Sequence, residues 1–235
     1  MTDLFYAFAE AAALIARCDP GLIEIVALSL RVSLSAVVIG TVLGMPLGAA
    51  IAIARFRGRG FLIVCVNALM GLPPVVVGLL VYLQLSSSGP LGVLQLLYTP
   101  AAMIIAQTIL VTPIVVALTR QFVEDANRTY DEELRSLGVR GARKLATLLV
   151  EVRYSLITVV FAGFGRAIAE GGAVMIVGGN IHHVTRVMTT AITLETSKGN
   201  LGLALALGIV LMLLALLVNG LATTVARFAP GTAYA

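Results

Sequence analysis

The chain has 235 residues, of which 59% are hydrophobic and 12% charged, with a net charge of +4 and a mean hydropathy of +1.02. A soluble domain of this size must cover much of its surface with polar groups, so this composition excludes an ordinary soluble fold and indicates membrane helices. The two cysteines, Cys18 and Cys65, are too few for a disulfide framework or a cysteine-based metal site.

The first twenty residues predict a helix at the membrane surface. Leu4 to Ala16 is apolar, but it contains Glu10 and is too short to cross a bilayer, which needs about 20 apolar residues. No basic residue precedes this apolar run, so it lacks the pattern of a secretory signal. We therefore assign residues 1–20 to an interfacial helix and residues 21–235 to a membrane domain.

The membrane domain contains five stretches that are long and apolar enough to span a bilayer. The predicted fold is therefore an all-α integral membrane protein with about five transmembrane helices. An odd number of spans and the lack of an internal repeat argue against two inverted halves, and a homodimer would supply the missing symmetry. The five stretches are Ile25 to Ala54, Phe61 to Leu85, Pro100 to Phe122, Tyr154 to Val177 and Leu201 to Ala226.

Basic residues are distributed unequally between the two sides of these spans. Eleven Lys and Arg residues fall on one side, three on the other and two within spans. Because positive charge is enriched on the cytoplasmic side, the sequence predicts that the N-terminus is outside and the C-terminus inside. The eleven are Arg55, Arg57, Arg59, Arg120, Arg128, Arg135, Arg140, Arg143, Lys144, Arg153 and Arg227.

Glycine and proline mark the first two spans. Gly40, Gly44 and Gly48 share one helix face, which predicts the close approach of another helix backbone. The stretch "GLPPVVVGLL" places Pro73 and Pro74 inside the second span, where each removes a backbone donor and should kink the helix. We assign these prolines to the lining of a translocation path, although kinked helices also occur as ordinary packing elements.

The fourth span contains a pair of opposite charges inside the membrane. Arg166 and Glu170 are one helical turn apart and share a helix face. A charge at this depth is costly unless it is paired or faces a wet cavity. Two interpretations follow: the pair neutralises itself and fixes helix packing, or it lies in the path or gate of an anion. Gly171 and Gly172 follow directly and predict a break or hinge.

Motifs for catalysis and nucleotide binding are missing from the sequence. His182 and His183 are adjacent, so they cannot share a helix face as zinc ligands four residues apart do, and there is no H-E-x-x-H. No G-x-x-x-x-G-K-[ST] occurs, so ATP must be bound by another chain if it drives the process. We predict no catalytic residue, no metal site and no nucleic-acid partner for this chain.

A polar segment separates the third and fourth spans. From Arg120 to Arg153, thirteen of 34 residues are charged, against fifteen of the other 201. Thr129 and Glu132 have the spacing of a capping box, which predicts that a separate helix begins there. The segment is either a solvated loop or an organised surface that a cytoplasmic partner binds.

The rest of this segment predicts a turn and a second helix. Tyr130, Leu134 and Leu137 would form one apolar face of the first helix. Gly138 then predicts the turn. Arg140 to Val150 predicts an amphipathic helix, with Leu145, Leu148 and Leu149 available to the membrane.

The stretch "EELRSLG", Glu132 to Gly138, resembles the EAA motif of permease subunits in ATP-binding-cassette importers. Glu132 and Gly138 occupy the first and last positions of the motif, whereas Glu133 and Leu134 stand where the family usually has two alanines. "GLPPVVVGLLVYLQLSSSGPLG" is similar to the molybdate and tungstate permeases. "GFGRAIAEGGAVMIVGGNI" and "TRVMTTAITLETSKGN" are most like the tungstate-type branch.

This resemblance implies the type I importer permease fold, with residues 21–235 as the permease domain and about 123–152 as its coupling segment. The function implied is ATP-driven import of a tetrahedral oxyanion, tungstate or molybdate with sulfate next, across the cytoplasmic membrane of a bacterium or archaeon. The implied partners are a second permease, two ATPases that bind ATP and magnesium, an extracytoplasmic binding protein on the outer loops, and membrane lipid. The ATPase-coupling residues are Glu132, Glu133, Leu134, Leu137 and Gly138, and the path or gate residues are Pro73, Pro74, Arg166, Glu170 and Gly171.

Three other functions are weighed against this one. A proton- or sodium-coupled secondary anion carrier would act alone, with Glu170 as its coupling group. A membrane enzyme is disfavoured by the missing catalytic residues. An ATP-driven exporter subunit is disfavoured by the resemblance of residues 132–138 to the EAA motif.

Overall fold

The computed structural model describes residues 2–54 and 56–226, and all regular secondary structure in these residues is helical. The prediction of an all-α protein is confirmed. The helices are α1 (Thr2–Ala16), α2 (Pro20–Ile53), α3 (Arg59–Met70), α4 (Pro74–Leu85), η1 (Gly92–Leu94), α5 (Pro100–Ser136), α6 (Gly141–Glu151), α7 (Arg153–Ile168), α8 (Gly172–Gly178), α9 (Met188–Ser197) and α10 (Leu201–Ala226).

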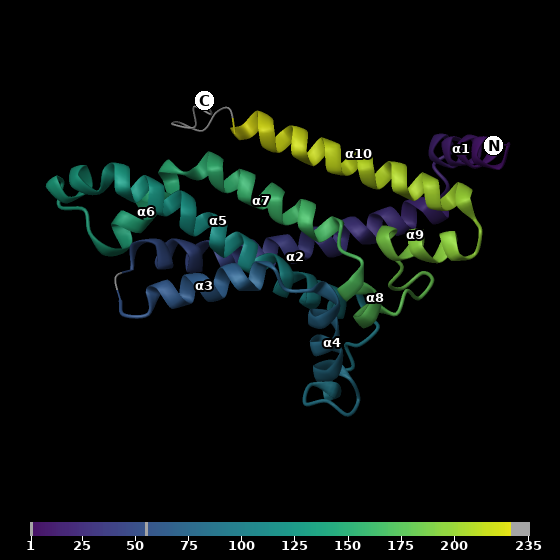
Figure 1. Cartoon of the computed structure of the whole chain (residues 1–235), viewed down its shortest axis with the longest axis horizontal. Helices are drawn as coiled ribbons and strands as arrows, with labels where there is room; N and C mark the ends of the chain where they lie inside the picture. Colours follow the sequence, from purple (N-terminus) through teal and green to yellow (C-terminus); the bar gives the residue numbers. More distant parts are fainter. Residues whose placement is uncertain (1, 55, 227–235) are drawn as a thin grey trace.

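Long helices form the main body of the molecule. Helices α2, α5, α7 and α10 run along its long axis, whereas α4 projects to one side (Figure 1). Within the described residues, α2, α5 and α10 are each long and apolar enough to cross a membrane, and the number of spans is up to five if each of the bent pairs α3–α4 and α6–α7 counts as one span. The orientation across the membrane stays a prediction, and Arg55, Arg227 and the C-terminus lie outside the described residues.

The second predicted span consists of two helices. Helix α3 ends at Met70 and α4 begins at Pro74, and their axes differ by 95°. Pro74 is the first residue of α4, a position where the missing amide N–H would be unpaired in any helix. The prolines therefore redirect the chain by starting a new helix, not by kinking a continuous one.

The fourth predicted span is broken in its second half. Helix α7 ends at Ile168 and α8 begins at Gly172, so the predicted break at Gly171 and Gly172 is confirmed. We refer to residues 169–171 as the α7–α8 break. At its other end α7 follows α6 directly, and these two helices are bent by 73°.

The glycine face of α2 packs directly against α5. A Cβ atom built on Gly44 would lie 2.8 Å from Val115 Cγ1, and one built on Gly48 would lie 2.5 Å from the Val116 carbonyl oxygen. Both separations are too short for real carbon atoms. The predicted close approach of a second backbone is therefore confirmed, and its partner is α5.

Replacing Gly48 by alanine is expected to destabilise the α2–α5 pair, because the new methyl group overlaps the α5 backbone. Overpacking of this kind costs about 1–3 kcal/mol, which corresponds to a melting temperature lower by roughly 3–10 °C. Gly208→Ala on α10 is the matched control, since no heavy atom lies within 4 Å of its added Cβ. Thermal melts of the two purified variants measure the difference, and equal melting temperatures would contradict the prediction.

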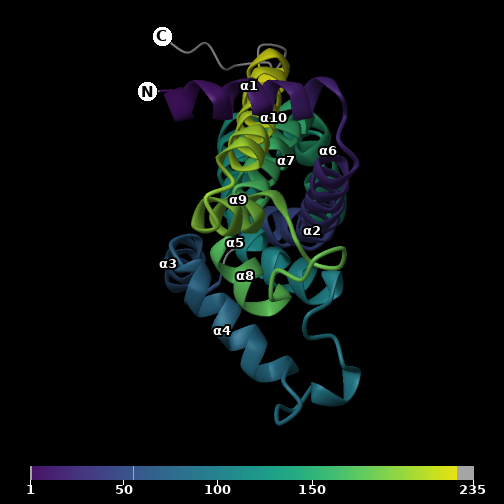
Figure 2. The same ribbon diagram turned by 90° about the vertical axis from the view of Figure 1, so that its right-hand side faces the viewer.

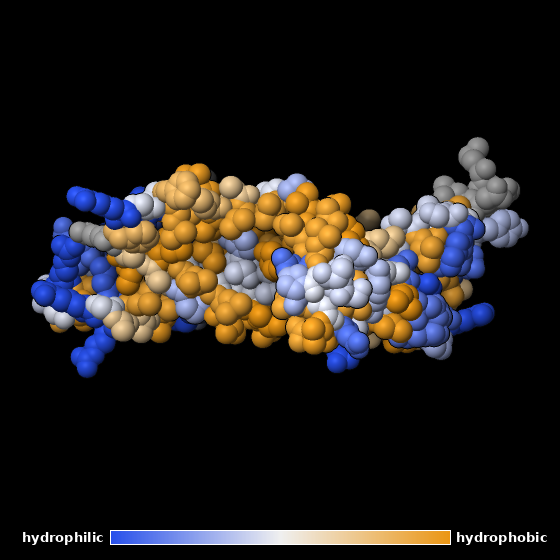
Figure 3. Space-filling view, turned by 90° about the horizontal axis from the view of Figure 1, so that it is seen from below, coloured by the Kyte–Doolittle hydropathy of each residue, from blue (hydrophilic) through white to orange (hydrophobic). Residues whose placement is uncertain are grey.

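Buried side chains form three clusters. The largest joins α2, α5, α7 and α10 with parts of α1 and α9; the second joins α4, α8 and the first half of α5. The third lies where α2 ends and α5 meets α6. Large apolar side chains remain exposed on α2, α3, α4 and α10. Such side chains cover much of the middle of the face in Figure 3, while hydrophilic residues gather at its two ends, as contact with lipid requires.

Helix α1 packs across the start of α10 (Figure 2). Ala7 and Ala11 are buried in this contact, and the Glu10 side chain lies directly against Gly202. A bulkier residue at position 202 would collide with the Glu10 carboxylate. This position is compatible with the interfacial helix predicted for residues 1–20, which stays a prediction.

Candidate functional site

The polar segment begins as a continuation of α5. This helix runs unbroken through Thr129 to Ser136, and the Thr129 hydroxyl donates to the Asp125 carbonyl oxygen at 3.2 Å. The prediction that a separate capped helix begins at Thr129 is therefore wrong. Extending an existing helix adds a hydrogen bond per residue without a new nucleation cost, and Val123 and Ala126 continue its buried face.

Glycine shapes the turn between α5 and α6, as predicted. Gly138 has φ +69° and Gly141 has φ +58°, in the left-handed region that favours glycine. No heavy atom lies within 4 Å of a Cβ built on either residue, so backbone conformation and not crowding requires glycine here. The amide of Val139 returns to the Leu134 carbonyl oxygen at 2.8 Å and closes the end of α5.

The predicted coupling residues divide into a buried and an exposed set. Leu134 is buried in the third cluster, together with the half-buried Tyr130. Leu137 is 75% exposed at the tip of the turn, and Glu132, Glu133 and Gly138 are also exposed. The predicted apolar face is therefore correct for its first two members, while Leu137 points away from the cluster.

The leucines of α6, predicted to be available to the membrane side, pack within the protein. Leu148 is 1% exposed, and Leu145 and Leu149 pack in the same cluster as Leu134. The hydrophobic face of α6 thus finds its partner in α5 and the end of α2. Packing one amphipathic face onto another removes both from solvent, which the sequence of α6 alone could not indicate.

Polar contacts hold α5 and α6 in a defined relative position. Asp131 forms ion pairs with Lys144 of α6 and with Arg135, the latter at 2.9 Å. The Tyr130 hydroxyl donates to Glu151 Oε1 at 3.2 Å. Together with the leucine cluster, these contacts fix α6 to α5 and hold the turn at residues 137–140 in position. A cavity of about 380 Å³ opens beside this turn, lined by Arg135, Val139, Arg140, Gly141 and Lys144.

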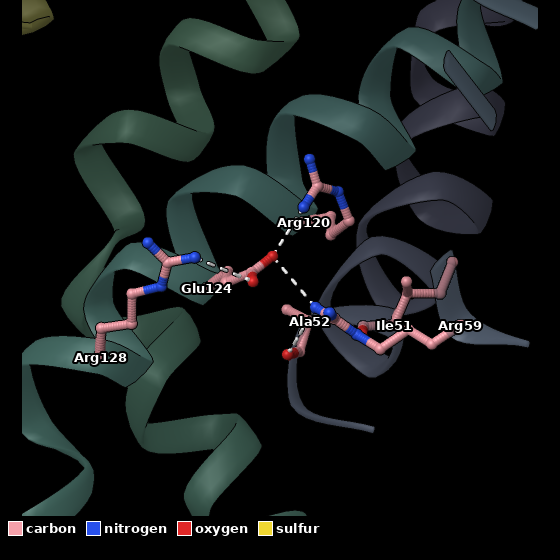
Figure 4. A network of polar contacts seen from close by, with 6 residues as sticks. All are labelled: Ile51, Ala52, Arg59, Arg120, Glu124 and Arg128. Atoms are coloured by element: carbon pink, nitrogen blue, oxygen red, sulfur yellow. Dashed lines mark hydrogen bonds and ion pairs between the residues drawn. The ribbon is translucent and has the colours of Figure 1, made fainter. Parts of the chain in front are cut away.

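Glu124 is the centre of a second charged cluster, which we call the Glu124 cluster (Figure 4). Its carboxylate accepts from Arg120 at 2.6 Å and from Arg59, the first residue of α3, at 3.0 Å. Arg128 pairs with it at 3.4 Å. Arg59 also donates from Nε to the Ile51 carbonyl oxygen at 2.9 Å, so it closes the end of α2. One side chain thereby joins α2, α3 and α5.

The electrostatics of this cluster favour the charged carboxylate. Burial raises the pKa of Glu124, but the hydrogen bond from Arg59 and the positive charges of Arg59, Arg120 and Arg128 outweigh it, so the pKa lies below its ordinary value of 4.5. Because the pKa is lower in the folded state, the stabilisation is fully present above about pH 4.5. It is lost as the pH falls through the folded pKa.

Replacing Glu124 by glutamine is expected to lower the melting temperature at pH 7 and to flatten its decline below pH 4.5, because the variant lacks the titrating carboxylate. Thermal melts of the purified protein between pH 7 and pH 3 measure both effects. Asp125→Asn is the matched control, since Asp125 is the exposed neighbour on the same helix. The assignment fails if Glu124→Gln and Asp125→Asn give the same pH profile.

Arg166 and Glu170 form the predicted pair. Arg166 Nη1 lies 2.6 Å from Glu170 Oε2, and the Glu170 side chain is 4% exposed. The other carboxylate oxygen, Oε1, accepts from the Ala173 amide at 3.1 Å. Glu170 therefore pairs with the end of α7 and caps the start of α8, where helix dipole and free amides favour a carboxylate.

The start of α4 lies against this break. A Cβ on Gly172 would lie 3.1 Å from Val75 Cγ2, and one on Gly78 would lie 2.8 Å from Ala173 Cα. The segment that begins with Pro73 and Pro74 thus packs closely against the one that begins with Gly171. The structure brings these predicted path residues into one region, together with the Arg166–Glu170 pair.

Two buried residues that the sequence did not single out also contact this region. Gln107 Nε2 donates to the Ala167 carbonyl oxygen at 3.0 Å, near the end of α7. Ser29 Oγ accepts from the amide of Met188, the first residue of α9, at 2.8 Å. A polar side chain inside an apolar span was the available signal for both residues, but it does not indicate which helix end it contacts.

Among the described residues, titratable groups elsewhere do not come together as a metal centre. In the described part of the chain, no three His, Cys, Asp or Glu side chains are grouped so that they could hold a metal ion. His183 instead contacts Glu24 at 2.7 Å near the start of α2. This contact joins the loop before α9 to α2.

Known proteins match almost the whole chain. The family described as the binding-protein-dependent transport system inner membrane component matches residues 28–229. The chain is 40% identical to a probable anion ABC transporter permease protein of Haloferax volcanii, over 89% of this chain and 93% of that protein. It is also 40% identical to the tungstate uptake system permease protein of Peptoclostridium acidaminophilum, over 90% and 93% of the two chains. The corresponding protein of Campylobacter jejuni is 37% identical, over 92% and 90%.

The family match runs from residue 28, within α2, through the end of α10 and includes both the α5–α6 turn and the α7–α8 break. They account for the apolar outer surface and for several helices that cross the membrane. The chain is a multi-pass membrane protein and belongs to the family of inner membrane components of binding-protein-dependent transport systems.

Proposed function

We propose that this chain is the permease subunit of an ATP-driven importer for a tetrahedral oxyanion. The proposed substrate is tungstate, with molybdate as the alternative. Support comes from the tungstate uptake permeases that are 37–40% identical to it over at least nine-tenths of its length. ATP and magnesium are bound by a separate ATPase subunit. Tungstate and molybdate have the same shape and charge, so the extracytoplasmic binding protein selects between them.

The α5–α6 turn couples the permease to the ATPase. The observation that carries this role is an exposed apolar residue next to a packed cluster: Leu137 is 75% exposed, while Leu134, three residues earlier, is buried. A docking element must transmit force, and the ion pairs of Asp131 fix α6 to α5. Glu132, Glu133 and Gly138 complete the exposed surface that the ATPase contacts.

Import follows an alternating-access cycle. A loaded binding protein docks on the outer loops, around residues 86–98 and 180–200, and closure of the ATPases moves the α5–α6 turn. Because α5 is continuous from Pro100 to Ser136, a movement at its inner end reaches α4 and α8 at its outer end. The α4–α8 contact is the gate, and the path attracts the anion only weakly, so the anion can leave.

A homodimer supplies the second wall of the path. Helix α4 packs on α8 and α5 with one face, while Val75, Leu79, Leu80 and Leu83 on the remainder are each about half exposed or more. This helix extends away from the bundle (Figure 2). A second copy of the chain covers this face in the assembled transporter.

A cysteine at position 80 is expected to cross-link two copies of the permease through a short bifunctional maleimide. The native Cys18 and Cys65 are first replaced by serine. Met212→Cys is the matched control, because Met212 is 65% exposed but lies on α10, on the opposite side of the molecule in Figure 1. Cross-linking at position 212 and none at position 80 would place the interface elsewhere.

Uptake by proteoliposomes tests the function directly. The permease is reconstituted with its ATPase, and radioactive tungstate is offered with the binding protein, with molybdate and sulfate as competitors. Uptake should require internal ATP on the ATPase side and the binding protein outside, with sulfate competing least. Uptake that a proton or sodium gradient drives without the ATPase would instead establish a secondary carrier.

A further inference from the structure

A small polar cavity lies among α2, α5, the α7–α8 break and the start of α9. Its volume is about 10 Å³, and its polar lining residues are Ser29, Ser33, Gln107, Glu170 and Thr189. Three of these side chains are deeply buried, with exposures of 4% for Ser29, 2% for Ser33 and 3% for Gln107, and Thr189 is half-buried. A polar cavity at this depth must satisfy its hydrogen-bonding groups internally.

Ser29, Glu170 and Thr189 form hydrogen bonds or ion pairs with residues around the cavity. The Ser29 hydroxyl donates to the Ile25 carbonyl oxygen at 2.7 Å and accepts from Met188. Glu170 is paired with Arg166 and with the Ala173 amide. The Thr189 hydroxyl donates to the Glu170 carbonyl oxygen at 2.9 Å. These contacts tie the start of α8 and the start of α9 to their neighbours.

Within the described part of the chain, Gln107 has a partner for only one of its two side-chain amide atoms. Its Nε2 donates to the Ala167 carbonyl oxygen, but among the described residues its Oε1 has no hydrogen-bond partner. Exchanging the two amide atoms does not solve this, because Oε1 would then face the Ala167 carbonyl oxygen. A buried acceptor without a partner is costly. Ser33, on α2, lines the same cavity and can donate from its hydroxyl.

The size and chemistry of the cavity identify its ligand. One water molecule needs about 10–15 Å³ and typically makes two to four hydrogen bonds in a buried site. An oxyanion is too large, and it would be repelled by the free acceptor of Gln107 and by the Glu170 carboxylate. We propose that the cavity holds a single ordered water molecule, which donates to Gln107 Oε1 and bonds to the Ser33 hydroxyl.

This water makes Gln107 a positioning residue for the α7–α8 break. Through Nε2 the side chain holds the end of α7, and through Oε1 and the water it is joined to α2. Helices α2, α5 and α7 are thereby fixed relative to one another. This happens next to the α7–α8 break, where the main-chain hydrogen bonds of the span are interrupted. The inference does not depend on which ion is transported.

A substitution that fills the cavity tests whether the cavity contains a water molecule or is empty. Ser33→Val places an extra methyl group where the water would lie and removes the Ser33 hydroxyl. With the water present, this variant of the full chain in lipid nanodiscs should melt roughly 3–8 °C lower, because Gln107 Oε1 is left unsolvated. In the background of Gln107→Met, which has no acceptor to strand, the same substitution should lower the melting temperature by less than half as much.

Two other results would overturn the proposal. A dry cavity predicts that Ser33→Val raises the melting temperature or leaves it unchanged. Simple overpacking predicts the same decrease with and without Gln107→Met. A structure of the full chain at about 2 Å provides the second measurement, even where a variant does not fold: a density peak about 2.6–3.2 Å from Gln107 Oε1 supports the water, and an empty cavity refutes it.

Discussion

Replacing Gly138 by valine is expected to lower ATP-driven uptake about tenfold or more, with the amount of permease in the membrane changed less than twofold. Gly138 has φ +69°, a conformation that costs an ordinary residue about 1–2 kcal/mol and a β-branched one more. The turn at residues 137–140 therefore rearranges, and Leu137 leaves the position in which the ATPase would contact it. The side chain itself meets no obstacle among the described residues, since apart from the two chain neighbours none of them has a heavy atom within 4 Å of its Cβ.

The variant Gly138→Asn tests whether uptake depends on the backbone conformation at position 138 or on the glycine residue itself. Asparagine tolerates the left-handed region, so this variant should retain most of the uptake activity. ATP hydrolysis by the reconstituted complex is measured alongside uptake, and in Gly138→Val the two should no longer be proportional. Full uptake by Gly138→Val would show that the α5–α6 turn does not couple the two subunits.

Replacing Glu170 by leucine is expected to produce the largest loss of stability. The side chain is 4% exposed, and its removal leaves Arg166, itself 31% exposed, without its counter-ion inside the protein. Breaking a buried ion pair on one side costs about 3–5 kcal/mol, and the Ala173 amide also loses its acceptor. We expect the melting temperature to fall by roughly 10 °C or more and the folded yield to decrease.

The double variant Arg166→Leu/Glu170→Leu decides between the two interpretations of this pair. Removing both charges should restore much of the stability, because no unpaired charge remains. If the pair only fixes helix packing, uptake recovers together with the melting temperature. If the pair acts in the path or gate, the protein folds but uptake stays low. A double variant less stable than Glu170→Leu would contradict the mutual neutralisation of the two residues.

The polar segment between α5 and α7 shows which structural features local sequence patterns predict correctly and which they do not. The turn at Gly138 was correctly predicted, because the ability to adopt a positive φ depends on the residue itself and its immediate backbone. The start of a helix at Thr129 was not, because a capping sequence is used only where the preceding chain is not already helical. Nor does the sequence of α6 indicate its partner. Leu148 faces α5 and not lipid, although both environments are apolar.

Around the predicted path residues, too, the sequence predicted the local contacts but not those between distant parts of the chain. The spacing of Arg166 and Glu170 was sufficient to predict their contact, because both residues lie on one helix face. Gln107 was missed, since its partner Ala167 is 60 residues away in the sequence. Pro73 and Pro74 were recognised as a change of direction, but the 95° angle between α3 and α4 depends on what α4 packs against.

The amino-acid sequence alone determined the helical membrane character of this protein, the glycine face of α2 and the break at Gly171. Each of these depends on hydrophobicity, spacing or backbone freedom within a few helical turns. Only the tertiary structure decided that Arg59 binds Glu124, 65 residues away, and that Ser29 caps α9, 159 residues away. The rotation and depth of each helix in the bundle determine these contacts, and they result from the packing of all the helices together.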